Sequence, residues 1–206
     1  MTDDAHKMIS PLSAQMADGR RERSRASRTK IIDALLDLVG QGEVDPSAAR
    51  VAEVAGVGLR SVFRHFKDMD SLYRELGESI AARVMPIILQ PPTGATWKEK
   101  FFDIAARRAT IFETILPYRI SSSIRRFQST YLMQDYRWMQ RLEWNATEVH
   151  LPVSVKADVA GTRGLNVILS FQTWRLLRHD QELPFEDAKA VVRRLLSDAM
   201  SRMPEV

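Results

Sequence analysis

The stretch of residues 47–66 constrains the fold more than any other part of the chain. Its small and apolar residues recur at the spacing of two short helices that each bury one face: Val51, Ala52, Ala55, Val62 and Phe66. Between the two helices stand Gly56, which can adopt the positive φ of a tight turn, and Val57, which fills the space between them. The stretch therefore predicts a helix-turn-helix, a motif that places its second helix in the major groove of DNA.

The outward side of the second predicted helix carries residues that can meet DNA: Leu59, Arg60, Ser61 and Arg64. Any hairpin of two helices can have small residues and a glycine at its turn, so those features alone are a weak sign of function. The complete set of small residues, the Val57 plug and the cationic outer face favours DNA binding. In this interpretation Arg60 and Arg64 contact DNA, while Leu59 and Ser61 help to read base edges.

Residues 25–85 resemble the DNA-binding domain of the tetracycline-repressor-like (TetR) family of bacterial regulators. The matching segments are residues 31–39, 51–57 and 63–66, together with Ser71 and Leu72. Beyond them the resemblance is one of helix number and length. It implies an all-α transcriptional regulator whose second domain binds a small molecule and forms the dimer, with repression as the family's default.

The resemblance also implies which residues contact DNA. The expected DNA-binding residues are Arg25, Arg28, Ser47, Gly58, Leu59, Arg60, Ser61, Phe63, Arg64, His65 and Lys67. The chain departs from the family at Gly58, where Ser or Thr is usual, at Phe63, where Tyr is usual, and at Met69, where Lys is usual. The Tyr hydroxyl and the Lys ammonium often touch phosphates in family members, so two backbone contacts are expected to be missing here.

Positive charge gathers at the same end of the chain. The net charge is only +4, but residues 20–67 hold ten Lys and Arg against six Asp and Glu, and five arginines fall between Arg20 and Arg28. Such an excess attracts phosphate, and its benefit shrinks as the salt concentration rises. The arginine run is either the solvated start of a helix or an arm that follows the DNA backbone or enters the minor groove.

The chain is long enough for one large domain or two small ones with a full core. We expect residues 1–19 to be disordered, because they are polar and show no helical period. A DNA-binding domain is expected at residues 20–85, and a domain for effector binding and dimerisation at 95–206. The proline and glycine residues of the loop at 90–94 mark the break between them.

No segment of the chain shows the two-residue alternation of a strand. The expected helices are residues 27–39, the two of the motif, one from Asp68 or Asp70 that ends or kinks at Pro86, 96–116, 117–127, 130–149, 154–179 and one from Pro184 onward. The sequence therefore predicts an all-α fold of about nine helices.

Aromatic residues in the second domain suggest a ligand cavity. Its expected lining is Phe101, Ala105, Phe127, Tyr131, Trp138 and Trp174. The interior of a helical bundle also needs large apolar side chains, and helical periodicity does not separate the two roles. Polar residues among the aromatics favour a cavity, since pockets are apolar with a few convergent polar groups. The residues in question are Arg125, Arg126, Gln134, Asp135 and Arg141, and the expected effector is a mostly apolar small molecule.

The last two expected helices carry regular apolar stripes, which suit a dimer interface. Its expected residues are Leu165, Leu169, Leu176, Val192, Leu195 and Ala199. The stripes can be buried against the helices' own domain or against a second copy of the chain. A two-fold dimer would hold two reading helices about 34–36 Å apart, which suits a palindromic site. Dimers of the TetR family form a four-helix bundle from the last two helices of each chain, so we predict a homodimer through residues 160–203.

An enzymatic function is not expected. The four histidines stand alone, without metal-ligand spacing, and the chain has neither a glycine-rich phosphate loop nor a Gly-x-Ser-x-Gly elbow. Ser121, Ser122 and Ser123 have no base nearby in the sequence and are better explained as a polar helix face. We therefore expect no cofactor and no metal.

Composition favours the cytoplasm, where a DNA-binding protein would associate with the nucleoid. The chain has no cysteine, which fits a reducing compartment. The uncharged run from Gly164 to Trp174 is too short to span a bilayer. The N-terminal residues are acidic and lack the apolar region of a secretory signal, so no membrane association is expected.

These features predict a sequence-specific transcriptional regulator, a repressor that a small molecule releases from a palindromic operator. The mechanism would be allosteric, with an effector that binds one of two states more tightly. The alternative is a DNA-binding regulator or a DNA-organising protein that lacks a small-molecule effector and is controlled by a protein partner.

Overall fold

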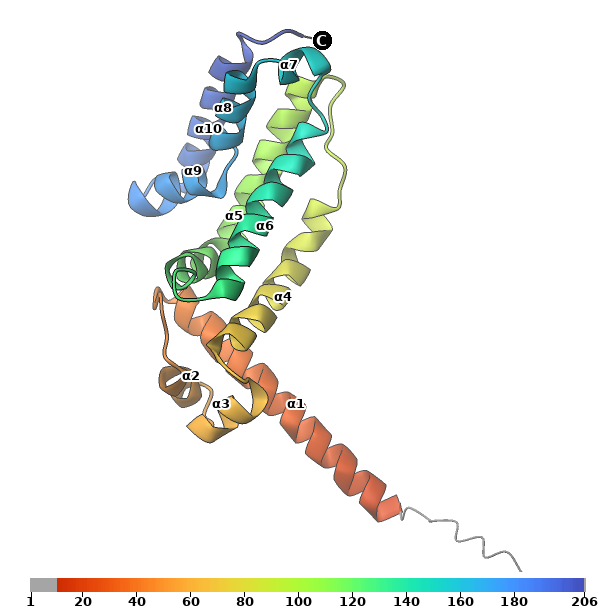
Figure 1. Cartoon of the computed structure of the whole chain (residues 1–206), viewed down its shortest axis with the longest axis vertical. Coiled ribbons are helices and arrows are strands. Elements are labelled where there is room, and N and C mark those ends of the chain that lie inside the picture. The colour runs from red at the N-terminus through yellow and green to blue at the C-terminus, as the bar shows by residue number, and fades with distance from the viewer. Residues whose placement is uncertain (1–10, 206) are drawn as a thin grey trace, which may run out of the picture. The chain divides into compact units, whose positions relative to one another are not determined.

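The structure, a computed structural model, describes residues 11–205, without the side chains of residues 11–18 and 20. Within that part of the chain the backbone forms ten α-helices and one π-helical turn, and no strand (Figure 1). The predicted all-α class is confirmed, with ten α-helices in place of about nine.

The chain divides into two compact units, Met1–Leu76 and Gly77–Val206. The division falls within helix α4, which spans Met69–Ile88. The predicted domain limits of 20–85 and 95–206 place the boundary after this helix, and they stay predictions.

The first unit buries one face of each of its helices. Helix α2 spans Ala48–Val54 and α3 spans Leu59–His65. Helix α1, which spans Pro11–Gly40, packs against both, and they pack against each other. The buried side chains come from all four helices and include Ile31, Leu35, Leu38, Val51, Val62, Phe66, Leu72 and Leu76. They recur mostly three or four residues apart, which brings them to one face of a helix. The predicted buried face of the motif is confirmed at Val51, Ala52, Val62 and Phe66, although Ala55 is only half-buried.

Helix α1 begins earlier than the sequence predicted. It spans Pro11–Gly40, so residues 11–19 are helical rather than disordered and the predicted start near Ser27 is wrong. The rest of the segment predicted to be disordered, residues 1–10, lies outside the described residues. The added turns, residues 11–26, contain three alanines and four arginines, which favour helix without needing a buried face. Because the side chains of residues 21–26 are exposed, no apolar stripe marks this part of the helix in the sequence.

The second unit is built on two long helices, α5 (Trp97–Arg125) and α6 (Thr130–Glu148). The remaining elements are α7 (Val153–Lys156), α8 (Val159–Ile168), α9 (Phe171–Arg175), the π-helical turn η1 (Leu176–Asp180) and α10 (Phe185–Met200). Helix α5 packs against α6, α9 and α10, and α10 packs against α8 (Figure 1). The buried side chains of α5 and α10 recur at helical spacing, so the two helices share the core of this unit.

Two prolines lie inside helices where the sequence predicted breaks. Helix α5 continues past Pro117 to Arg125, so the predicted break there is wrong. Helix α4 continues past Pro86 to Ile88, so it does not end there, and the alternative of a kink stays a prediction. A proline removes one backbone donor and crowds the preceding turn. Around Pro117 core packing offsets this cost, since Ile115 and Tyr118 are buried on either side of it.

The single helix predicted for residues 154–179 is also wrong. The chain forms three short helices and the π-helical turn there, because two polar side chains cap new helix starts. Asp158 accepts a hydrogen bond from the Gly161 N–H at 2.9 Å, and Ser170 accepts one from the Thr173 N–H at 3.2 Å. Caps of this kind compete with continuation of the preceding helix.

Candidate DNA-binding surface

The turn between α2 and α3 has the geometry that its glycine permits. Gly56 has a φ of 64°, in the left-handed region that favours glycine, as predicted. The Val57 N–H donates to the Ala52 carbonyl at 3.0 Å, which closes the end of α2. Helix α3 begins after Gly58, whose carbonyl accepts from the Ser61 N–H at 2.8 Å but which has no side chain to cap the helix. The turn thus directs α3 away from α2 within a few residues.

Helix α3 turns one face to solvent. Val62 is 2% exposed, whereas Leu59 is 44% exposed and Phe63 is 51% exposed. Arg60 and Arg64 are also exposed and stand four residues apart, as Leu59 and Phe63 do. Residues four apart lie one turn apart on the same side of a helix, so an apolar pair runs beside a cationic pair. Such a face can offer cations to phosphates and guanines, and apolar contact to thymine methyl groups.

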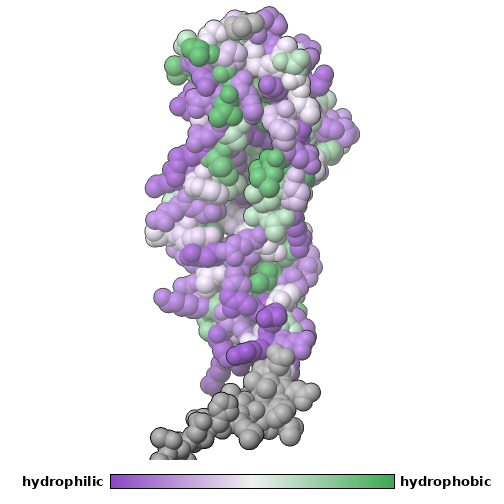
Figure 2. Space-filling model, turned by 90° about the vertical axis from the view of Figure 1, so that its right-hand side faces the viewer, coloured by the Kyte–Doolittle hydropathy of each residue, from purple (hydrophilic) through white to green (hydrophobic). Residues whose placement is uncertain are grey.

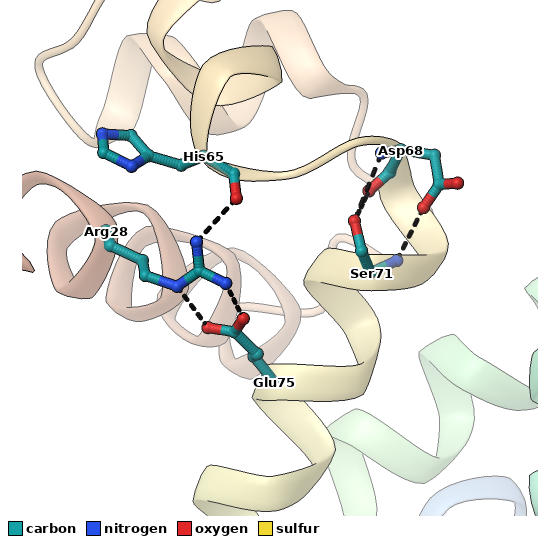
Figure 3. A network of polar contacts seen from close by, with 5 residues as sticks. All are labelled: Arg28, His65, Asp68, Ser71 and Glu75. Atoms are coloured by element: carbon teal, nitrogen blue, oxygen red, sulfur yellow. Dashed lines mark hydrogen bonds and ion pairs between the residues drawn. The ribbon is translucent and has the colours of Figure 1, made fainter.

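Arg28 is bound inside the first unit rather than free for DNA. Its guanidinium pairs with Glu75 of α4, with Nε 2.8 Å from Oε2, and its Nη1 donates to the His65 carbonyl at 2.6 Å (Figure 3). The guanidinium carbon also lies 4.5 Å from the centre of the Phe66 ring. These contacts join α1, the end of α3 and α4. Because the guanidinium is already engaged, we leave Arg28 out of the proposed DNA contacts.

Asp68 and Ser71 determine where α4 begins (Figure 3). The Ser71 N–H donates to Asp68 Oδ1 at 2.8 Å, and the Asp68 N–H donates to Ser71 Oγ at 3.2 Å. This reciprocal pair satisfies donors that the start of a helix leaves free. It also lowers the pKa of Asp68, chiefly through the bond from the Ser71 backbone. Of the two predicted caps, Asp68 is the one that the structure uses.

The other predicted contact residues differ in how free they are. Ser47 caps α2 and accepts from the Arg50 N–H at 3.2 Å, so its hydroxyl oxygen is engaged locally. Arg25 and Lys67 are exposed, and Ser61 is half-buried. Arg25 adds positive charge to the surface from α1. A contact between Arg25 and DNA would therefore not depend on the orientation of α3.

His65, at the end of α3, is half-buried and its Nε2 has no hydrogen-bond partner among the described residues. Burial, followed by the charges of Arg64 and Arg28, lowers the pKa of His65 below its ordinary value of 6.5. The unfolded chain keeps the ordinary pKa, so it binds a proton at a pH where the folded side chain is still neutral. The free energy of unfolding therefore falls as the pH falls through 6.5.

A His65→Gln variant is expected to lose less stability than the wild type between about pH 7.5 and pH 5.5. Denaturant unfolding at the two pH values measures the difference. His150→Gln is the comparison in the second unit, because burial and Lys100 lower the pKa of His150 as well; it should reduce the loss of stability through its own titration and leave His65 unchanged. An equal loss of stability in the wild type and in His65→Gln would show that His65 does not titrate as its surroundings imply.

The six residues of the predicted effector cavity lie in different surroundings. Phe101 is 0% exposed in the core, where its ring packs edge-on against Trp97 at 5.5 Å. Phe127 and Trp138 are 73% and 52% exposed, and Tyr131 is half-buried. None of these four is a wall residue of the cavities described below. Their assignment to a common pocket stays a prediction.

The remaining two predicted residues, Ala105 and Trp174, do line one cavity, of about 430 Å³. Its other walls include Phe102, Glu186, Lys189 and Arg193. Trp174 is buried, and its indole N–H donates to Glu113 at 2.9 Å. This cavity lies between α5, α9 and α10.

Two further cavities lie beside α6. The isoleucine cavity, of about 150 Å³, is bounded by α4, α5 and α6 and its walls include Ile87, Ile88, Ile104, Ile111, Ile115 and Leu142. The arginine cavity, of about 210 Å³, has walls that include Arg119, Arg126, Asp135, Tyr136, Phe171 and Arg175. The sequence indicated Arg126 and Asp135 as polar residues near a site. The sequence did not indicate Arg119 and Arg175, which lie far apart in the chain and come together only in the folded structure.

The predicted dimer residues also divide. Leu165, Leu169 and Val192 are buried within their own unit, so they are not available at the centre of an interface. Leu176 and Leu195 are 46% and 42% exposed, and Ala199 is half-buried. Helix α10 therefore has two adjacent stripes. The buried stripe is Ala188, Val192, Leu196 and Met200, and the outer stripe is Val191, Leu195 and Ala199.

Exposed apolar side chains occur elsewhere on the second unit as well. On helix α8, Val159 and Val167 are 66% and 63% exposed. The face drawn in Figure 2 carries separate hydrophobic areas among hydrophilic residues. In the described part of the chain no helix is long and apolar enough to cross a membrane, and no group of three or more His, Asp or Glu is placed to hold a metal ion.

Comparison with known proteins identifies a structural relative. The chain resembles the crystal structure of a transcriptional regulator from Rhodococcus sp. Rha1, with a TM-score of 0.65. The likeness covers 87% of this chain and 98% of that chain at 14% identity, so it shows a shared fold alone. No family model and no curated protein sequence matches the chain.

Proposed function

We propose that this chain is a sequence-specific DNA-binding transcriptional regulator of the TetR type. One observation carries the proposal: α3 is anchored by Val62 on one side and exposes Leu59, Arg60, Phe63 and Arg64 on the other. This face places two apolar side chains beside two cations, which suits the base edges and phosphates of DNA. The fold shared with a transcriptional regulator supports the same function.

The proposed DNA contacts fall into two classes. Arg60 and Arg64 meet guanines or phosphates, and Leu59, Ser61 and Phe63 meet base edges from the same helix. Phe63 offers only an apolar ring where family members commonly have a Tyr hydroxyl, so it suits a thymine methyl better than a phosphate. Exposed cations of α1, such as Arg25, add sequence-independent attraction to phosphates.

Selection of duplexes from a random DNA pool by the full chain tests this function. We expect enrichment of a palindrome whose half-sites lie about one helical turn apart, because each α3 is short and two copies are needed to read enough bases. The affinity of the enriched duplex should exceed that of random duplex and fall steeply with salt. Equal binding to all duplexes would favour a DNA-organising protein instead, and absence of binding at low salt would overturn the proposal.

We further propose that a mostly apolar effector acts through the second unit. The isoleucine cavity supports this, because its walls are largely aliphatic and its lining includes Ile87 and Ile88 of α4, the helix that contains residues of both units. An effector that binds one arrangement of α4 more tightly would shift the protein toward that arrangement. We propose that the effector releases the protein, a repressor, from its operator. The proposed location is the cytoplasm, at the nucleoid.

A homodimer is part of the proposal, with its interface moved to the outer stripe of α10 and the exposed valines of α8. Leu195→Glu is expected to convert the dimer to a monomer, because it would place two like charges at a two-fold seam. Light scattering at micromolar concentration measures the change. Since Leu195 is exposed in the single chain, the variant should still fold.

Ser197→Glu is the control for this variant, since Ser197 is exposed on the same helix but outside the outer stripe. It should remain dimeric. A wild-type chain that is already monomeric, or a Leu195→Glu variant that stays dimeric, would place the interface elsewhere or remove it.

A further inference from the structure

The arginine cavity collects positive charge inside the second unit. Three of its wall residues are Arg119, Arg126 and Arg175, and Asp135 is its only acidic wall residue. Carboxylates outside the wall, Glu143 and Asp180, pair with Arg119 and Arg175. Each of the three arginines nevertheless keeps one buried nitrogen without a hydrogen-bond partner among the described residues, and a buried donor left without a partner is costly, so the cavity suits an anion.

Arg119 is the most buried of the three, with 7% of its surface exposed. Its Nη1 lies 3.2 Å from Glu143 Oε1, and its guanidinium carbon lies 4.6 Å from the centre of the Phe171 ring. The other amino group, Nη2, is buried and has no hydrogen-bond partner among the described residues. Glu143 and the ring hold the guanidinium in place, and one edge is left to donate.

Arg126 and Arg175 are each held in place by a partner as well, and each keeps one buried nitrogen without a hydrogen-bond partner among the described residues. The guanidinium of Arg126 stacks 3.8 Å from the centre of the Tyr136 ring, and its Nε is buried without a hydrogen-bond partner. Arg175 pairs with Asp180 through Nη2 at 3.3 Å, while its Nε is likewise buried and without a partner. A guanidinium that is stacked on a ring keeps its N–H groups in a fixed plane, which suits the planar fork of a carboxylate or the oxygens of a phosphate.

Asp135 limits how much negative charge the cavity can accept. Burial raises the pKa of Asp135, and the charge of Arg119 opposes this effect. The carboxylate would compete with a bound anion for the arginines. Beside the charges lie the apolar side chains of Leu132 and Met139, which can receive a small apolar body attached to the anionic group.

We propose that the arginine cavity binds a small organic anion through its carboxylate or phosphate group, with Arg119, Arg126 and Arg175 as the recognising cations. The anion supplies the hydrogen bonds that the three N–H groups lack, and its body packs against the apolar side of the cavity. This site is distinct from the isoleucine cavity, although Met139 borders both. The binding of the anion does not depend on the proposed function in DNA binding.

The test uses the full chain with benzoate, phenyl phosphate and inorganic phosphate as probes, and benzamide as the neutral match of benzoate. Calorimetry and the melting temperature report binding, since a ligand that binds only the folded state raises the melting temperature. We expect benzoate or phenyl phosphate to bind and benzamide not to bind. Binding by the carboxylate alone or by the two phosphates alone tells which anionic group the cavity selects.

Arg126→Gln and Arg175→Gln are each expected to lower the affinity for the probe about tenfold, because each removes a charge-assisted donor. Arg137→Gln is the matched control. It also removes one positive charge, from α6, the helix that carries Tyr136, but Arg137 is exposed and is not a wall residue of the cavity. Asp135→Asn should tighten binding. It also serves as the second test should an arginine variant fail to fold.

Failure of all three anions to bind at millimolar concentration would overturn the proposal, as would binding that survives both arginine variants. The same protein samples are then tested on the enriched duplex. Anion binding without DNA binding would leave the anion site standing and remove the proposed function, whereas DNA binding without anion binding would do the reverse.

Discussion

Arg60→Ala is expected to weaken binding to the enriched duplex by about 1–3 kcal/mol, which corresponds to about 5- to 150-fold in affinity. Arg60 lies in the first turn of α3 and is exposed, with the apolar Leu59 and Phe63 beside it. The N-terminal part of a recognition helix is the part that commonly meets base edges. An arginine fork on a guanine distinguishes that base from the others, so the variant should also relax the preference at one base pair of each half-site.

Two control variants separate base contact from general attraction. Arg50→Ala removes an exposed arginine of α2 that is already paired with Glu43 and Glu53, so we expect little change in affinity or preference. Arg25→Ala should weaken all sequences alike and make the dependence of affinity on salt shallower by about one charge. Fluorescence anisotropy at several salt concentrations measures each effect. Unchanged operator affinity in Arg60→Ala would contradict the assignment of α3 as the reading helix.

Arg28→Ala is expected to lower the free energy of unfolding of the first unit by about 1–3 kcal/mol. The guanidinium holds Glu75, the His65 carbonyl and the face of the Phe66 ring at once, and its removal leaves a partly buried carboxylate without its cation. The side chains of Arg28 and Glu75 are 40% and 25% exposed, so water recovers part of the loss and the effect stays below that of a fully buried pair. Denaturant unfolding of the full chain, followed through the first unit's helical signal, gives the change.

The role of Arg28 is separated from that of a DNA contact by two comparisons. Glu75→Gln should destabilise the first unit as well, and the double variant should cost less than the sum of the two single ones, because both remove the same interaction. Arg25→Ala should leave stability nearly unchanged, since Arg25 is exposed on the same helix. An Arg28→Ala variant of normal stability, but with weaker DNA binding and a shallower dependence on salt, would show that the side chain leaves Glu75 to contact DNA.

The local architecture of the first unit could be predicted from the sequence because short-range rules govern it. The positive φ of Gly56 depends only on the turn itself. The cap by Ser47 and the hydrogen bond between Asp68 and Ser71 each join residues three positions apart in the chain. Val51 and Val62 are buried because any amphipathic helix turns its apolar stripe inward. The exposed face of α3 follows from the same periodicity, so the candidate surface could be named before the fold was known.

Tertiary structure decided which of several available partners a side chain takes. Arg28 has the sequence position of a cationic arm, but α4 brings Glu75 within reach from 47 residues away. Arg119 and Arg175 meet in one cavity only because α5 and α9 pack together. Leu169 and Val192 fitted an interface and a core equally well by periodicity, and packing of α8 and α10 buried them inside the unit. Helical spacing specifies the direction of a side chain relative to its own axis, whereas its neighbours depend on how the helices cross, which arises from contacts between residues far apart in the chain.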